Sequence, residues 1–134
     1  MKKTLALILA AVMLLSLAAC GAKPAVTVDY GESEMYTKEQ LAEAAKLIEK
    51  TIDGFEGDCE LHSLTYLGDE RSGADLAYIA SLGLGDYNNC MVFGSSFRSP
   101  KDGGGAWEPD TEYTWEFYLG SENGTDWEVV TYGY

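Results

Sequence analysis

The chain has 134 residues, of which 22 are acidic and nine are basic, so its formal net charge is −13. This length suits one domain with a hydrophobic core and is too short for two. The negative charge repels nucleic acids and anionic lipid headgroups, so we expect no nucleic acid among the partners of this protein.

The N-terminal segment has the layout of a secretory signal. Lys2 and Lys3 are followed by an apolar stretch from Leu5 to Leu17 and then by small residues. The apolar stretch has 13 residues, whereas a helix that spans a bilayer needs about 20. We therefore expect a cleaved signal peptide rather than a permanent transmembrane helix.

The end of this segment, Leu17-Ala18-Ala19-Cys20, resembles the lipobox of bacterial lipoproteins. The resemblance implies that the Cys20 thiol receives a diacylglyceryl group and that the signal is cut before Cys20. The mature protein is then extracytoplasmic and held on the bacterial cell membrane by two acyl chains, each stabilised by about 0.8 kcal/mol per buried CH₂. The alternative is an ordinary secretory signal with an Ala-x-Ala type of cleavage site and an unmodified cysteine.

We divide the chain into a lipoprotein signal peptide (1–19), a lipidated N-terminus with a spacer (20–33) and a single α+β domain (34–134). Without residues 1–19, seven basic residues stand against 22 acidic ones, a formal charge of −15. The spacer contains Pro24 and lacks helical periodicity. Its alternating Val26 and Val28 also suit a short edge strand, so spacer and strand can overlap.

The clearest secondary-structure signal is a helix from about Lys38 to Asp53. Thr37 and Gln40 have the spacing of a capping box, and Gly54 stands where a helix closes. Apolar residues at helical spacing form one face of this segment, which we expect to pack on a sheet rather than on a partner protein. They are Leu41, Ala44, Ala45, Ile48, Ile52 and Phe55.

After this helix the hydrophobic period changes to two. Residues 59–67 and 90–97 are predicted strands, with a short helix at about residues 74–82 between them that Ser72 caps. The next loop, 98–110, contains two prolines and three consecutive glycines, which rule out regular structure. Residues 113–119 and 126–132 are predicted to form a hairpin whose three-residue loop places Gly124 in the left-handed region.

That loop length fixes the register of the predicted hairpin. On the face toward the helix, it pairs Leu119 with Trp127, Phe117 with Val129 and Trp115 with Thr131. The opposite face then carries polar and aromatic residues, namely Glu112, Thr114, Glu116, Tyr118, Glu128, Val130, Tyr132 and Tyr134.

This order of elements resembles the cystatin-like fold and the related nuclear-transport-factor-like fold. We therefore expect an α+β domain in which one long helix packs on a four- or five-stranded antiparallel sheet. The resemblance implies architecture only, because the Gln-x-Val-x-Gly hairpin and the Pro-Trp pair of cystatin inhibitors are absent. The segments "GDCELHSLTYLGDE" and "WEVVTYGY" are also similar to small lipoproteins of Gram-positive gut bacteria, which supports the same localisation and fold.

The sequence gives little support for catalysis. Cys59 and His62 lie on opposite faces of a strand, so they form no local dyad. A contact between Cys90 and His62 across strands is the weaker alternative to a half-buried histidine beside Glu60. Cys59 and Cys90 are too far apart for a disulfide if their strands are direct antiparallel neighbours, whereas other strand pairings would allow one.

We expect no metal and no cofactor. Asp102, Glu108 and Asp110 around the glycine run have oxygen atoms that suit Ca²⁺, but their spacing matches no EF-hand pattern. A solvated acidic loop is the simpler explanation.

The best candidates for a recognition surface are aromatic and acidic residues, because aromatic faces beside hydrogen-bonding groups suit glycans and peptides. They are Trp107, Tyr118, Tyr132, Tyr134, Glu116 and Glu128. The alternative is that these residues pack across strands beneath the N-terminal segment. We therefore expect a lipid-anchored module that binds a peptide, cell-wall or glycan ligand. The alternatives are an extracytoplasmic enzyme without a recognisable motif, or an inhibitor-like module by fold analogy alone.

Overall fold

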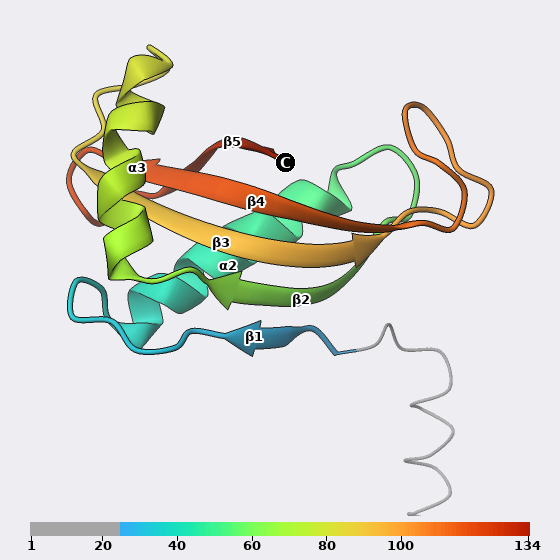
Figure 1. Ribbon diagram of the computed structural model, residues 1–134, viewed down its shortest axis with the longest axis horizontal. Helices are drawn as coiled ribbons and strands as arrows, with labels where there is room; N and C mark the ends of the chain where they lie inside the picture. The colour runs from blue at the N-terminus through green and yellow to red at the C-terminus, as the bar shows by residue number, and fades with distance from the viewer. Residues whose placement is uncertain (1–24) are drawn as a thin grey trace, which may run out of the picture.

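A computed structural model describes residues 25–134, so the predicted signal peptide and the lipidation site Cys20 lie outside the described residues. Within them, five strands form one sheet in the order β1-β2-β3-β4-β5, with a helix on each face (Figure 1). The elements are β1 (Thr27–Asp29), α2 (Lys38–Asp53), β2 (Glu60–Tyr66), α3 (Asp69–Ser81), β3 (Asn89–Arg98), β4 (Glu112–Ser121) and β5 (Glu128–Gly133). The predicted α+β class is confirmed.

The sheet is mixed. β1 runs parallel to β2, whereas the other neighbouring strands are antiparallel, so the prediction of a wholly antiparallel sheet is wrong. A parallel pair needs a long crossover connection, and α2 provides it between β1 and β2. The edge strand expected at Val26 and Val28 is confirmed as β1, which includes part of the 20–33 spacer in the folded domain.

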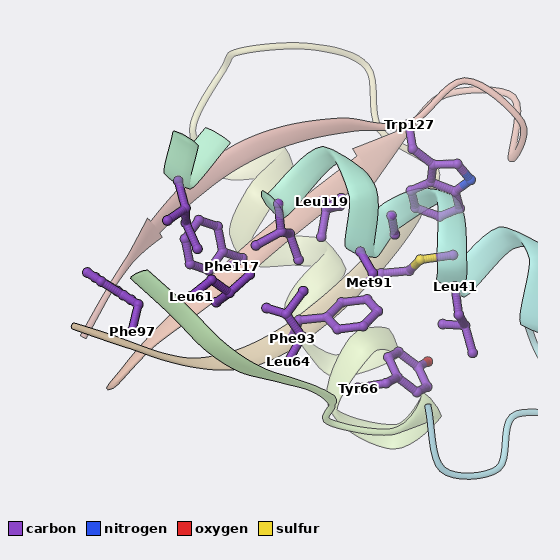
Figure 2. Packing of buried hydrophobic residues seen from close by; sticks show 14 of the residues in the cluster. Leu41, Leu61, Leu64, Tyr66, Met91, Phe93, Phe97, Phe117, Leu119 and Trp127 are labelled. Carbon is purple, nitrogen blue, oxygen red and sulfur yellow. The ribbon is translucent and has the colours of Figure 1, made fainter. Parts of the chain in front are cut away.

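α2 has the predicted bounds because its signals are local. The Thr37 hydroxyl accepts a hydrogen bond from the Gln40 N–H, and the Gln40 side-chain oxygen accepts one from the Thr37 N–H, which completes the capping box. The buried face of α2 consists of Leu41, Ala44, Ala45, Ile48 and Ile52. It packs against Met91, Phe93, Phe97, Phe117 and Leu119 from the sheet (Figure 2). Because full burial of each large apolar side chain contributes about 1.5–3 kcal/mol, this face holds α2 on the sheet.

A second helix covers the opposite face of the sheet at one end (Figure 1). The prediction of one long helix is therefore wrong, since α2 has 16 residues and α3 has 13. α3 buries Ile79 against Cys90 and Val92, which form a smaller second core. No helix within residues 25–134 has the length and apolar character needed to cross a membrane.

α3 begins earlier than the predicted helix at 74–82. Ser72 is not its cap but lies inside it, where its hydroxyl accepts a hydrogen bond from the Val92 N–H. The first residue, Asp69, accepts hydrogen bonds from the Ser33 hydroxyl and the Glu34 N–H. These partners are distant in the sequence, so they gave no local signal for the start of α3.

The β4–β5 hairpin has a longer loop and another register than predicted. Gly120 pairs with Glu128 and Leu119 with Val129, but Tyr118 pairs with Thr131. The extra residue Val130 forms a bulge, which reverses the alternation of the side chains beyond it. Gly124 is left-handed as predicted, with φ of 79°.

The bulge changes the face assigned to Tyr132, whereas Trp127 lies on the α2 side as predicted. The Tyr132 ring stacks on Phe117 and Trp115, so it lies on the α2 side and not on the opposite face. Trp127 precedes β5 and is buried against the Tyr36 ring, with centroids 5.3 Å apart. The predicted pairs of Leu119 with Trp127, Phe117 with Val129 and Trp115 with Thr131 are therefore wrong.

Candidate functional site

Aromatic side chains surround a hollow of about 400 Å³ on the α2 side of the sheet. We call it the aromatic hollow, and its lining residues are Phe55, Ala106, Trp107, Tyr113, Trp115, Tyr132 and Tyr134. The rings contact one another in tilted, edge-on and stacked arrangements, with centroids 5.2–6.2 Å apart. Such geometries are favourable for aromatic pairs, so the walls of the hollow support one another.

Four parts of the chain build the aromatic hollow, one of which is β5 with Tyr132 and the following residue Tyr134. Phe55 follows the end of α2, and β4 contributes Tyr113 and Trp115. The glycine-rich loop contributes Trp107, whose Nε1–H donates to the Glu56 carbonyl over 3.1 Å. Gly103 in this loop has φ of 71°, and a Cβ there would lie 2.8 Å from the Trp107 carbonyl oxygen. Glycine at this position therefore allows the loop to turn tightly and present Trp107.

Two tyrosines leave the aromatic hollow open to solvent. Tyr132 is 44% exposed and Tyr134 is 91% exposed. Phe55, Trp107, Tyr113 and Trp115 are half-buried beside them. The hollow therefore offers apolar ring faces that a ligand can reach.

A second hollow lies on the other side of the sheet, beside α3. This hydroxyl groove has a volume of about 550 Å³, and its lining includes Ser63, Thr65, Leu67, Gly94, Ser96 and Thr114. Ser63 and Ser96 share a hydrogen bond of 2.7 Å across β2 and β3. This groove was not predicted from the sequence, although the alternating hydroxyl residues Ser63 and Thr65 of β2 indicate a polar sheet face.

The hydroxyl groove and the aromatic hollow adjoin at the outer side of β4. Both are lined by Trp115 and Tyr134. The lining of the groove also includes Glu116 and Gly133 at the end of β5. One ligand can therefore contact both hollows at this edge.

A charged cluster borders the hydroxyl groove near α3. The Arg71 guanidinium donates to both oxygens of Glu116, over 3.1 and 2.5 Å, and to Asp75. The Arg71 contact and a second hydrogen bond from Tyr118 hold the pKa of Glu116 below its ordinary value. Burial, followed by the hydrogen bond to Glu116, raises the pKa of Tyr118 to about 12. This cluster fastens α3 to β4.

A second charged cluster surrounds His62. Its Nε2 and Nδ1 lie 2.9 Å from the carboxylates of Glu60 and Glu112, respectively. Burial alone would lower the pKa of His62, but the hydrogen bonds to these two glutamates outweigh it and raise the pKa. His62 is half-buried beside Glu60, as predicted.

The cysteines take no part in either cluster. Cys59 and Cys90 are free and buried, in the α2-side core and the α3-side core respectively. β2 and β3 are direct antiparallel neighbours, the arrangement that we expected to keep these two residues apart. Burial raises the pKa of the Cys90 thiol to about 12, so this thiol is a poor nucleophile.

The structure divides the predicted recognition residues between the two sides of the sheet. Trp107, Tyr132 and Tyr134 line the aromatic hollow. Tyr118, Glu116 and Glu128 belong to the α3 side, where the Tyr118 ring contacts Tyr78 and Glu128 accepts a hydrogen bond from Tyr87. The predicted single binding face is therefore replaced by two sets of residues.

The glycine-rich loop shows no metal-binding cluster. Among residues 25–134, no group of three or more histidine, cysteine, aspartate or glutamate side chains is arranged to hold a metal ion. The Asp110 carboxylate lies 3.5 Å from the Arg98 guanidinium.

Comparison of the chain with protein-family models, curated proteins and solved structures finds no match.

Proposed function

We propose that this protein is a lipid-anchored extracytoplasmic binding module whose ligand, a peptide or a glycan, enters the aromatic hollow. The observation that carries this proposal is the set of six aromatic rings around an open hollow of about 400 Å³. Ring faces stack on apolar peptide side chains and on the C–H faces of sugars, and adjacent tyrosine hydroxyls supply hydrogen bonds.

The lipid anchor in this proposal is inferred from the sequence alone. Leu17-Ala18-Ala19-Cys20 resembles a lipobox, and Lys2, Lys3 and the apolar stretch precede it in the order of a signal peptide. Residues 1–24 lie outside the described residues.

We also propose that the architecture of the domain is related to the cystatin-like fold. α2 packs across one face of a sheet in which β2 to β5 are antiparallel, and this part supports the resemblance. The parallel strand β1 and the helix α3 on the opposite face depart from it. Inhibition of proteases therefore has no support beyond the analogy.

Binding has more support than catalysis. Both ring nitrogens of His62 face carboxylates, and the two cysteines of the described residues are buried in separate cores. Neither arrangement supplies a nucleophile beside a base.

A ligand panel on the full chain in detergent tests this proposal. The panel contains cell-wall glycan fragments, extended peptides and metal ions, and binding is followed by tryptophan fluorescence in a Trp127→Phe background. The signal then comes from Trp107 and Trp115 in the aromatic hollow.

A matched pair of variants localises the binding. Tyr132→Ala removes a ring of the hollow, whereas Tyr78→Ala removes an equally exposed tyrosine on α3. We expect about tenfold weaker binding for Tyr132→Ala, because an aromatic contact contributes on the order of 1 kcal/mol or more, and unchanged binding for Tyr78→Ala. Equal effects of the two variants, or no response to any member of the panel, would contradict the proposed site.

A further inference from the structure

The outer edge of β4 is paired over only half of its length. β3 pairs with β4 from Glu112 to Ser121, whereas β5 pairs with it only from Glu116 to Gly120. Figure 1 shows that β5 ends part-way along β4, on the side of the glycine-rich loop. The β4 segment Glu112–Trp115 therefore has a neighbouring strand on one side only.

The backbone groups of this segment can be assigned to its two sides. The Trp115 carbonyl accepts a hydrogen bond from the Ser95 hydroxyl of β3, and the Thr111 carbonyl accepts one from the Ser99 N–H. Peptide groups alternate in direction along a strand, so the N–H and C=O groups of Glu112 and Thr114 point to the outer side.

These outward groups form a free sheet edge. Glu112 and Thr114 are both exposed. Within residues 25–134, no backbone or side-chain group of the protein hydrogen bonds to their N–H or C=O groups. An edge of this kind is a template for an added strand.

Each side of this edge has a hollow that can receive side chains. The aromatic hollow lies on the α2 side and the hydroxyl groove on the α3 side, and both include Trp115 and Tyr134. The side chains of an added strand alternate between the two faces of a sheet. One set would enter the aromatic hollow and the other the hydroxyl groove, next to the Glu116 carboxylate.

The charge of the protein indicates which side chains suit the groove. The chain from Cys20 onward has a formal charge of −15. The exposed Glu112 carboxylate lies at the free edge, where it also contacts His62 and Arg98. This field favours basic side chains on the α3 side. It also disfavours pairing with a second, equally acidic copy of the chain.

We propose that an extended peptide with alternating aromatic and basic residues binds antiparallel to the free edge of β4 at Glu112–Trp115, in line with β5. This inference rests on the proposed function and specifies its ligand as a peptide. Main-chain hydrogen bonds to Glu112 and Thr114 supply affinity, and the two hollows select the side chains.

The probe is an acetylated and amidated hexapeptide that alternates lysine and tyrosine. In an antiparallel pair, residues opposite Glu112 and Thr114 share their face and exchange hydrogen bonds with them. The lysines therefore lie on the groove side and direct their N–H groups to β4, while the tyrosine N–H groups point to solvent. N-methylation of the lysines should weaken binding about tenfold or more, and N-methylation of the tyrosines should leave it unchanged.

Two measurements on the full chain in detergent complete the test. Amide hydrogen exchange of Glu112 and Thr114 should slow about tenfold or more when the peptide binds. Thr114→Pro removes an outward N–H and should lose binding, whereas Thr114→Ala keeps this N–H and should lose far less affinity than Thr114→Pro, because it changes only a side chain that lines the hydroxyl groove. If Thr114→Pro fails to fold, the methylated peptides decide the question on the wild-type chain.

The outcomes separate this inference from the proposed function. Equal loss with both methylated peptides, or no loss with either, would overturn strand addition. A fluorescence response to an N-acetylglucosamine tetrasaccharide but not to the hexapeptide would also overturn it and leave the binding module intact. No response to any ligand would overturn both.

Discussion

At the scale of single residues, Arg71 shows how one side chain joins two elements. It belongs to α3, and its guanidinium contacts the Glu116 carboxylate and the Tyr118 hydroxyl of β4. Bidentate pairs of arginine and carboxylate combine charge with fixed geometry. Because both side chains are about one-third exposed, solvent screens the pair and limits its contribution to stability.

Replacement of Arg71 by Met should lower the free energy of unfolding by about 1 kcal/mol at pH 7. The folded pKa of Glu116 lies below its ordinary value of 4.5. Its ion pair therefore stabilises the domain above about pH 4.5, and this contribution is lost as the pH falls through the lowered pKa. Urea unfolding at pH 7 and pH 3 measures the effect, which should be smaller at pH 3. Arg98→Met is the control, because Arg98 approaches the carboxylates of Asp110 and Glu112 only to 3.5 and 3.9 Å and otherwise donates a hydrogen bond of 3.0 Å to the Asp110 carbonyl. An equal loss of stability at both pH values for Arg71→Met would contradict the prediction.

Two aromatic residues of the hairpin should differ in their effect on stability. Trp127 is 7% exposed and packs on Tyr36, whereas Tyr132 is 44% exposed at the rim of the aromatic hollow. Trp127→Ala should cost about 3–5 kcal/mol as a core loss, and Tyr132→Ala about 1 kcal/mol. Thermal melts of both variants decide this; equal destabilisation would mean that Tyr132 is a core residue rather than part of a ligand site.

At the scale of elements, the sequence predicted the bounds of a helix where the residues that set these bounds lie within or beside that helix. The bounds of α2 follow from Thr37, Gln40 and the apolar face, which all lie within or beside the helix. The start of α3 depends on hydrogen bonds that Asp69 accepts from the Ser33 hydroxyl and the Glu34 N–H, and no local sequence pattern contains these partners.

The hairpin register explains why the candidate site was predicted only in part. Trp107, Tyr132 and Tyr134 were identified as recognition residues, but the bulge at Val130 moved Tyr132 to the α2 side. A bulge depends on how β4 and β5 pack, so alternation along one strand does not reveal it. The sequence patterns place Phe55 and Trp115 between the helix and the sheet and assign no role to Tyr113, and only the three-dimensional arrangement shows that all three line the hollow.

The buried face of α2 gives a direct test of the fold. Ile48 is fully buried against the sheet, so Ile48→Asp places a carboxylate where it must be neutralised or expelled. The cost is several kcal/mol against a total stability of about 5–15 kcal/mol, and the domain should unfold. Circular dichroism melts would measure this, with Glu43→Asp on the exposed face of α2 as the control. A cooperative melt of Ile48→Asp within a few degrees of the wild type would contradict the packing of α2.

At the scale of the whole molecule, the first described strand and the candidate site lie at opposite edges of the sheet. The chain enters the sheet at the edge strand β1, whereas the free edge of β4 and the aromatic hollow lie toward β5. The outer side of β4 therefore lies at the far edge of the sheet from β1, where the described part of the chain begins. The acidic charge of the domain also keeps it apart from anionic headgroups, which favours a site presented to ligands outside the membrane.

The tether itself is tested at Cys20, the residue that receives the lipid in this proposal. Cys20→Ala removes the only thiol at the end of the apolar stretch, so the variant should take up no label from a palmitate analogue supplied to the cells. Wild-type protein and a Thr27→Ala control, altered at an exposed position of β1, should both be labelled. Two acyl chains make a lasting anchor, so both should also partition into the detergent phase after cleavage of the signal. Mass spectrometry of the mature N-terminus should find the diacylglyceryl group on Cys20; labelling of Cys20→Ala at the wild-type level would show that the lipid, if present, is attached elsewhere.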